Sequence, residues 1–75
     1  APARPELFEA LRAWRAEQAA AQGVPAYHLF SQKTLYALAA AAPKTQAKLS
    51  GIHGIGPKKL ARYGDALLDL VRQYA

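Results

Sequence analysis

The sequence predicts an all-α domain, a compact bundle of about five helices. Three observations favour this fold class. Apolar residues recur at three- and four-residue spacing, no segment alternates as a β-strand does, and Gly or Pro stands near most expected helix ends. At 75 residues, just over half of them apolar, the chain can build one hydrophobic core.

The first helix is expected from about Pro5 to Gln22. Pro5 suits the first turn of a helix, and the acidic residues Glu6 and Glu9 suit the positive end of its dipole. Gly23 then ends the helix. The inward stripe is expected to comprise Leu7, Leu11, Trp14, Gln18 and Ala21.

Residues 24–30 are expected to form a connector without helix, because Pro25 cannot continue one. The second helix follows Ser31, an N-cap residue, and Phe30 and Leu35 are spaced for a hydrophobic staple across its start. Pro43 ends this helix. Its inner face is expected to comprise Leu35, Leu38, Ala39 and Ala42.

A short third helix is expected from about Thr45, its N-cap, to Ser50. The glycine-rich residues 51–56 then lead into a fourth helix, from Pro57 to Tyr63. Gly64 is expected to interrupt it. A fifth helix follows from about Asp65 to Tyr74, with Leu67, Leu68, Val71 and Tyr74 turned inward.

The composition argues against several classes of protein. There is no Cys for disulfides or thiolate metal sites, no apolar run of about 18 residues for a membrane span, and no signal-peptide pattern. The lack of Cys fits an intracellular, reducing setting, and a cytoplasmic, nucleoid-associated location is expected. The chain also lacks Met and starts with a linker-like Ala-Pro-Ala-Arg-Pro segment. We expect residues 1–5 to be a linker remnant and residues 6–75 to be one module of a larger protein.

The charge balance favours a polyanionic partner. Ten Lys and Arg against five Asp and Glu give a net charge of +5. In so short a chain this charge indicates DNA or RNA as the partner. An anionic membrane is a less favoured partner. The alternative is that the basic balance only aids solubility.

Residues 45–63 have the pattern of a helix-hairpin-helix. Gly54 and Gly56 permit positive φ and let a ligand backbone come close. The helix that starts at Pro57 presents unpaired N–H groups, a natural place for a phosphate. Lys58 and Lys59 in that turn oppose the helix dipole, which favours an external anion there.

A structural alternative stays open for this hairpin. The glycines can simply make a tight corner between two short helices. Ile52 and Ile55 would then anchor the corner in the core.

Taken together, these segments resemble the HRDC family, the helicase-and-RNase-D C-terminal domain. The matching pieces are residues 7–15, 24–27, 30–31, 34–35, 43 and 49–64. The resemblance implies a compact bundle of about five helices. It also implies an auxiliary role, in which the domain helps a helicase or nuclease bind nucleic acid or docks to another surface, without catalytic residues of its own. Members of the family differ in surface charge, and some bind single-stranded DNA weakly or not at all.

The segment 31–35 and the basic surface look like those of bacterial RecQ HRDC domains. The resemblance therefore implies an ATP-dependent DNA helicase of DNA repair and recombination as the parent protein. An RNase D-like nuclease stays open as the other parent.

The nucleic-acid-binding residues are expected to be Tyr27, Lys33, Gly54, Gly56, Lys58, Lys59 and Arg62. Tyr27 can stack on an unpaired base, worth roughly 1–3 kcal/mol, or fold back as a lid on the first helix. Arg62 lies one turn beyond Lys58, so the two can flank one backbone.

The remaining polar residues are expected to have structural or solvent-exposed roles. Arg15 is expected to bridge to Asp65 or Asp69. His28 and His53 have no partners at ligand spacing, and the carboxylates are scattered. No metal site, cofactor or catalytic group is therefore expected.

These observations predict a monomeric domain that weakly contacts single-stranded or branched DNA through the phosphate backbone and tunes the substrate preference of a RecQ-type helicase. No membrane partner is expected. Two alternatives stay open: a module with negligible DNA affinity that docks to the helicase core or another protein, and an RNA-binding domain of an RNase D-like nuclease.

Overall fold

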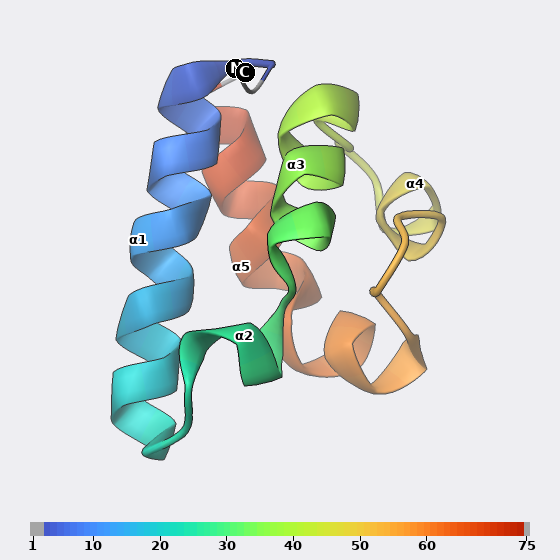
Figure 1. Ribbon diagram of the computed structural model, residues 1–75. Helices are drawn as coiled ribbons and strands as arrows, with labels where there is room; N and C mark the ends of the chain where they lie inside the picture. Colours follow the sequence, from blue (N-terminus) through green and yellow to red (C-terminus); the bar gives the residue numbers. More distant parts are fainter. Residues whose placement is uncertain (1–2, 75) are drawn as a thin grey trace.

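The computed structural model describes residues 3–74, which form five α-helices and no strand (Figure 1). The helices are α1 Pro5–Gln22, α2 Ala26–Leu29, α3 Gln32–Ala41, α4 Gln46–Ser50 and α5 Pro57–Tyr74. The predicted fold class is confirmed. None of the described helices is long and apolar enough to cross a membrane.

The helices surround a single core. In Figure 1, α5 lies behind α1 and α3, and α4 lies at the outer side of α3. Helix α1 contacts α2, α3 and α5, and α4 packs against α5. The fully buried aliphatic side chains come from four of the helices: Leu7, Leu11, Leu35, Leu38, Leu49, Leu67 and Val71.

Helix α1 has the predicted bounds and the predicted glycine end. Gly23 adopts a left-handed conformation with φ 68°, and its N–H donates to the Ala20 carbonyl oxygen. The predicted inward stripe is wrong at its last member, since Ala21 is exposed and Ala19 is buried instead. Ala21 belongs to the last turn of α1, which projects past α2 (Figure 1).

The predicted connector contains one helical turn, α2, so the expectation of a non-helical segment was wrong. Pro25 immediately precedes this turn, and its carbonyl oxygen accepts from the His28 N–H at 3.0 Å. Proline cannot continue a helix, but at a helix start its missing N–H costs no hydrogen bond. The turn lets Leu29 enter the core.

Helix α3 begins as predicted. The Ser31 hydroxyl oxygen accepts from the Thr34 N–H at 3.2 Å, and Phe30 and Leu35 are both buried. The four residues of the predicted inner face are buried as well: Leu35, Leu38, Ala39 and Ala42. Thr45 likewise caps α4, since its hydroxyl oxygen accepts from the Lys48 N–H at 3.2 Å.

Helix α5 runs without interruption through Gly64, so the predicted division into two helices was wrong. A β-carbon at Gly64 would lie 3.0 Å from the side-chain oxygen of Gln46 on α4. Glycine costs about 1 kcal/mol in a helix interior, and here it lets α4 pack closely on α5. Tyr74, predicted to turn inward, is 47% exposed on the last turn.

Two side chains of α1 connect it to the start of α3. Trp14 is partly buried as predicted, with its ring centroid 5.7 Å from that of Phe30 and 5.5 Å from that of Tyr63. The Arg15 guanidinium donates to the Phe30 carbonyl oxygen at 2.9 Å.

The predicted bridge from Arg15 to an α5 carboxylate is wrong, because Arg15 is engaged with the α2–α3 junction. Asp65 instead accepts from Gln46 at 3.0 Å, and Asp69 pairs with Arg72 at 3.5 Å.

The start of the domain is tied to the end of α3. Arg4 Nη1 donates to the carbonyl oxygens of Ala39 at 3.1 Å and Ala40 at 2.6 Å. The expected linker of residues 1–5 lies partly outside the described residues, and its boundary stays a prediction. Arg4 itself is bonded to the end of α3, and Pro5 is the first residue of α1.

Candidate nucleic-acid interface

The hairpin between α4 and α5 is held by its own backbone hydrogen bonds and by side chains that pack in the core. The Ile52 N–H donates to the Leu49 carbonyl oxygen at 3.1 Å, and the Ile55 N–H donates to the Ile52 carbonyl oxygen at 3.0 Å. Ile55 is buried, and Ile52 packs against the core cluster. The hairpin therefore has a defined shape before any ligand binds.

Gly54 turns the hairpin against α3. Its φ is 91°, in the left-handed region, and a β-carbon there would clash with the Thr34 side-chain hydroxyl oxygen. That hydroxyl also donates to the carbonyl oxygen of His53 at 3.0 Å. Gly54 is thus needed for the tight corner, which supports the structural alternative for this glycine.

Gly56 has a different environment from Gly54. Its φ lies outside the left-handed region, and a β-carbon built on it meets nothing within 4 Å. Its carbonyl oxygen accepts from the Leu60 N–H at 2.9 Å, which places it directly before the first turn of α5. Gly54, Gly56, Pro57, Lys58 and Lys59 line a shallow hollow of about 470 Å³ at this point.

An adjoining groove of about 330 Å³ brings together cations from the first two turns of α5. Lys58, Lys59 and Arg62 line it, together with His28 from α2 and Tyr63 from α5. No acidic side chain is among the described residues that line this groove. The arrangement is therefore a positively charged surface that no lining carboxylate neutralises.

Aromatic rings hold two of these cations in place. The Lys59 Nζ lies 5.0 Å from the centroid of the Phe30 ring, and the Arg62 guanidinium carbon lies 5.4 Å from that of Tyr63. Such contacts are worth roughly 0.5–1 kcal/mol at exposed sites. Lys58 is exposed and makes no such contact among the described residues. The groove thus combines two cations that rest against aromatic rings with one that is exposed to solvent.

Tyr27 and Lys33 lie on neighbouring elements rather than in this groove. Tyr27 is 74% exposed on α2, so it is not a lid on α1. Lys33 is exposed in the first turn of α3, next to Thr34, which bonds the hairpin. The structure therefore clusters five of the seven candidate residues, namely Gly54, Gly56, Lys58, Lys59 and Arg62. It places Tyr27 and Lys33 outside both hollows.

Residues 4–71 of the chain match the family model of the HRDC domain. The chain belongs to the HRDC family. The fold agrees with this assignment, since the third HRDC domain of RecQ from Deinococcus radiodurans superimposes with a TM-score of 0.88 at 38% identity. That comparison covers 93% of this chain and 92% of the other.

Sequence relatives of this HRDC domain occur in two kinds of helicase and in a nuclease. The chain is 46% identical over 67 residues to the ATP-dependent DNA helicase UvrD2 of Mycobacterium tuberculosis, and 43% identical over 70 residues to RecQ of Bacillus subtilis. It is 35% identical over 75 residues to ribonuclease D of Pseudomonas paraeruginosa. These matches cover 89%, 93% and 96% of this chain, but only 10%, 12% and 20% of those proteins.

The resemblance to bacterial RecQ HRDC domains is confirmed, and UvrD2 joins RecQ as a helicase relative. HRDC is an accessory domain of such helicases. A UvrD-type relative was not expected from the sequence, because the residues of this domain carry no motif of a helicase motor.

Gln22 and Tyr63 are among the groove residues of this HRDC domain that sequence reasoning missed. The Gln22 side chain donates to the Tyr63 hydroxyl at 2.6 Å, and both line the groove. Tyr63 was recognisable, because it lies one turn from Lys59 on the same helix. Gln22 gave no local signal, since only the tertiary packing of α1 against α5 brings it there.

No group of His, Asp and Glu side chains suited to hold a metal ion occurs among residues 3–74. His28 and His53 lie in different surroundings. His28 lines the groove, and His53 is an exposed hairpin residue whose carbonyl oxygen is bonded to Thr34.

Proposed function

We propose that this HRDC domain is a non-catalytic accessory domain that weakly contacts single-stranded or branched DNA through the phosphate backbone. The observation that carries the proposal is the groove of Lys58, Lys59 and Arg62, which has three cations and no lining carboxylate. Contacts of this kind position a strand without reading its bases.

The start of α5 supports the same proposal. Lys58 and Lys59 stand in the first turn, where a cation works against the helix dipole. An anion beside this turn would offset the unfavourable interaction of the two lysines with the dipole. It could also accept hydrogen bonds from the unpaired N–H groups of the helix start. The open space at Gly56 leaves room for a phosphate to approach. Tyr27, exposed on α2, is available for stacking with a base next to the contacted phosphates.

We further propose that the parent protein is an ATP-dependent DNA helicase. Support comes from the relatives, since UvrD2 and the RecQ of Bacillus subtilis are both described as such and are more similar to this chain than the ribonuclease D. In that setting the domain would tune which DNA structures the motor engages.

Salt dependence tests the proposed contact. If three to five phosphates are bound, log Kobs against log salt concentration should have a slope of about −2 to −3.5 for a single strand. The measurement is a fluorescence-anisotropy titration of a labelled short DNA strand at several salt concentrations. A slope near zero would contradict backbone binding.

Paired substitutions locate the contact. Lys58→Gln with Lys59→Gln should weaken binding by about eightfold per lost phosphate contact at ~50 mM salt, from a slope of ~0.7 per contact. The matched control is Arg12→Gln with Arg72→Gln, which removes the same charge at exposed sites outside the groove. An equal loss of DNA affinity in both pairs of variants would mean that only the net charge of the domain matters.

Three further outcomes separate the alternatives. If only Tyr27→Ala and Lys33→Gln reduce the affinity, the contact lies at α2 and the start of α3 rather than at the hairpin. Tighter binding of RNA than of a DNA strand of equal length would favour the nuclease parent. No measurable binding of either strand would favour a protein-docking module.

A further inference from the structure

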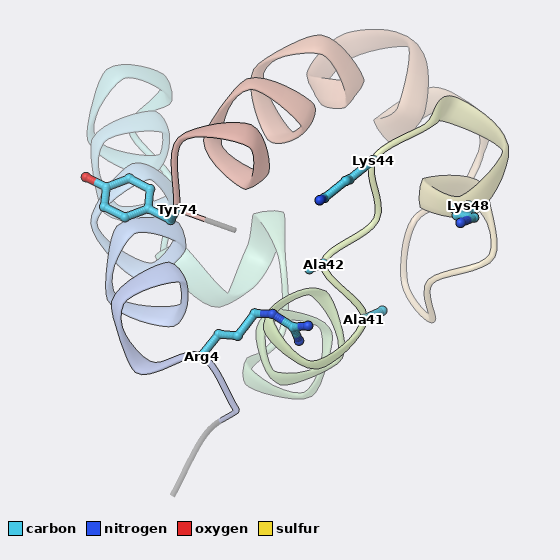
Figure 2. A pocket seen from close by; sticks show the side chains of 6 residues that line it. All are labelled: Arg4, Ala41, Ala42, Lys44, Lys48 and Tyr74. Atoms are coloured by element: carbon cyan, nitrogen blue, oxygen red, sulfur yellow. The ribbon is translucent and has the colours of Figure 1, made fainter.

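A second basic hollow, of about 530 Å³, lies near the other end of α5 (Figure 2). Its lining residues are Arg4, Ala41, Ala42, Lys44, Lys48 and Tyr74. None of them lines the groove at Lys58. Lys58 and Tyr74 are 16 residues apart on α5, which corresponds to roughly 24 Å along the helix. The hollow is therefore separate from the proposed interface.

The charges of this hollow face a common space. In Figure 2, the Arg4 and Lys44 side chains come from opposite sides of the hollow with Ala42 between their charged ends, and Lys48 stands farther out on the neighbouring α4. The ring of Tyr74 points away from them. No acidic side chain is among the described residues of the lining. The two ion pairs found in residues 3–74, Arg12–Glu9 and Arg72–Asp69, involve none of these cations.

The Arg4 guanidinium is held in position before any ligand arrives. Its Nη1 donates to the carbonyl oxygens of Ala39 and Ala40, which lie in the last turn of α3, where helix carbonyls lack an intrahelical partner. The same contact suits the negative end of the α3 dipole. Neither Nε nor Nη2 takes part in these two bonds, so both can donate to an anion.

Backbone strain is concentrated at the same place. In residues 3–74, Arg4 with φ 49° and Ala42 with φ 45° are the non-glycine residues with positive φ. Both line this hollow. The left-handed conformation costs an ordinary side chain about 1–2 kcal/mol, and such strain tends to collect at functional sites. Glycine or asparagine would usually occupy the position of Ala42 after a helix.

We propose that this hollow is a second phosphate-binding site, which takes the sugar–phosphate backbone of a nucleic-acid strand. One phosphate lies between Arg4 and Lys44, and the next along the strand lies beside Lys48. The contact is to the backbone alone, because the ring of Tyr74 points away and offers no stacking surface inside the hollow. The site goes beyond the groove at Lys58 and does not depend on it.

The test follows the hollow and the groove separately in the same protein. Backbone amide shifts are recorded while a short DNA strand is added, and the amides of Ala41, Ala42 and Tyr74 report the hollow. We expect these amides to shift, and to shift equally well when Lys58→Gln and Lys59→Gln have disabled the groove. Lys44→Gln with Lys48→Gln should raise the dissociation constant measured from these amide shifts by about eightfold per lost contact at ~50 mM salt. The pair Arg12→Gln and Arg72→Gln is the charge-matched control.

Three results would overturn the second site. The first is no shift of these amides although the groove binds the strand, which would leave the proposed function intact. The second is equal weakening by the control pair, which would reduce the hollow to a contribution of net charge. The third is a response to inorganic phosphate with none to the strand, which would mark a site for small anions only. Shifts at the hollow without binding in the groove would instead uphold the second site and contradict the groove as the place of the proposed DNA contact.

Discussion

Gly54 and Gly56 stand two residues apart in the same hairpin, yet they meet different constraints. Gly54 adopts a left-handed backbone and its missing side chain makes room for Thr34 on α3. Gly56 has neither constraint, and it faces open space before α5. At the residue scale, one glycine therefore shapes the hairpin, while the other leaves its surface accessible.

Alanine substitution separates these two roles. Gly54→Ala should destabilise the domain by at least about 1–2 kcal/mol from the left-handed backbone alone, with the Thr34 clash in addition. Gly56→Ala should change the stability by less than about 0.5 kcal/mol, since a weaker cap is offset by a less flexible unfolded chain. Urea denaturation followed by circular dichroism measures both. Equal losses would contradict the distinct environments of the two glycines.

At the scale of the elements, the start of α3 connects two parts of the molecule. Ser31 caps the helix through the Thr34 N–H, and the Ser31 and Thr34 hydroxyl oxygens lie 3.0 Å apart. The Thr34 hydroxyl in turn donates to the hairpin at His53. The cap thus fixes the first turn of α3 and, through it, the corner that leads to α5.

Removing this cap should be measurable. Ser31→Ala is expected to cost about 1 kcal/mol of unfolding free energy, the usual cost of losing an N-cap hydroxyl. Ser50→Ala is the matched control, because the exposed Ser50 hydroxyl only bonds the Ala47 carbonyl oxygen within α4. Thermal and chemical denaturation of the three proteins give the comparison. A loss for Ser50→Ala as large as that for Ser31→Ala would contradict the capping role.

At the scale of the whole molecule, α5 joins two basic regions. The groove lies along its first turns and the second hollow near its last turn, and the two share no lining residue. Between them the helix is fixed by Leu67, Leu68 and Val71 in the core. The domain therefore holds its two positive regions at a constant separation.

This arrangement predicts a stoichiometry. At low salt, two short DNA strands should bind per domain, and one strand should remain when either Lys58 and Lys59 or Lys44 and Lys48 are changed to Gln. Native mass spectrometry counts the bound strands directly. A single strand per unaltered domain, displaced by either pair of substitutions, would show that both regions serve one site.

Most of the fold could be predicted from the sequence, because the signals that begin and end helices are local. Ser31 and Thr45 cap their helices as predicted, and Gly23 ends α1. The errors arose where tertiary packing overrides a local rule. Gly64 lies inside the continuous helix α5 with the Gln46 side chain of α4 close to it, and Pro25 begins a turn that places Leu29 in the core.

The candidate site was predictable only in part, for the same reason. Lys58, Lys59 and Arg62 share one helix, so their proximity follows from helical spacing. Gln22 and His28 reach the same groove through the packing of α1 and α2. The hollow of Arg4 and Lys44 joins residues 40 positions apart, and no local pattern connects them.

The cluster of Trp14, Phe30 and Tyr63 gives the domain an optical property. Trp14 is the single tryptophan of the chain, and its ring meets Tyr63 edge-on at a centroid distance of 5.5 Å. Tyr63 lines the groove, and Lys59 rests on Phe30, the other ring against Trp14. A strand that draws Lys59 off Phe30 changes the surroundings of the indole. We therefore expect the tryptophan emission of the domain to serve as a built-in, label-free indicator of occupancy at the groove, and to respond less to the hollow, which none of these three rings lines.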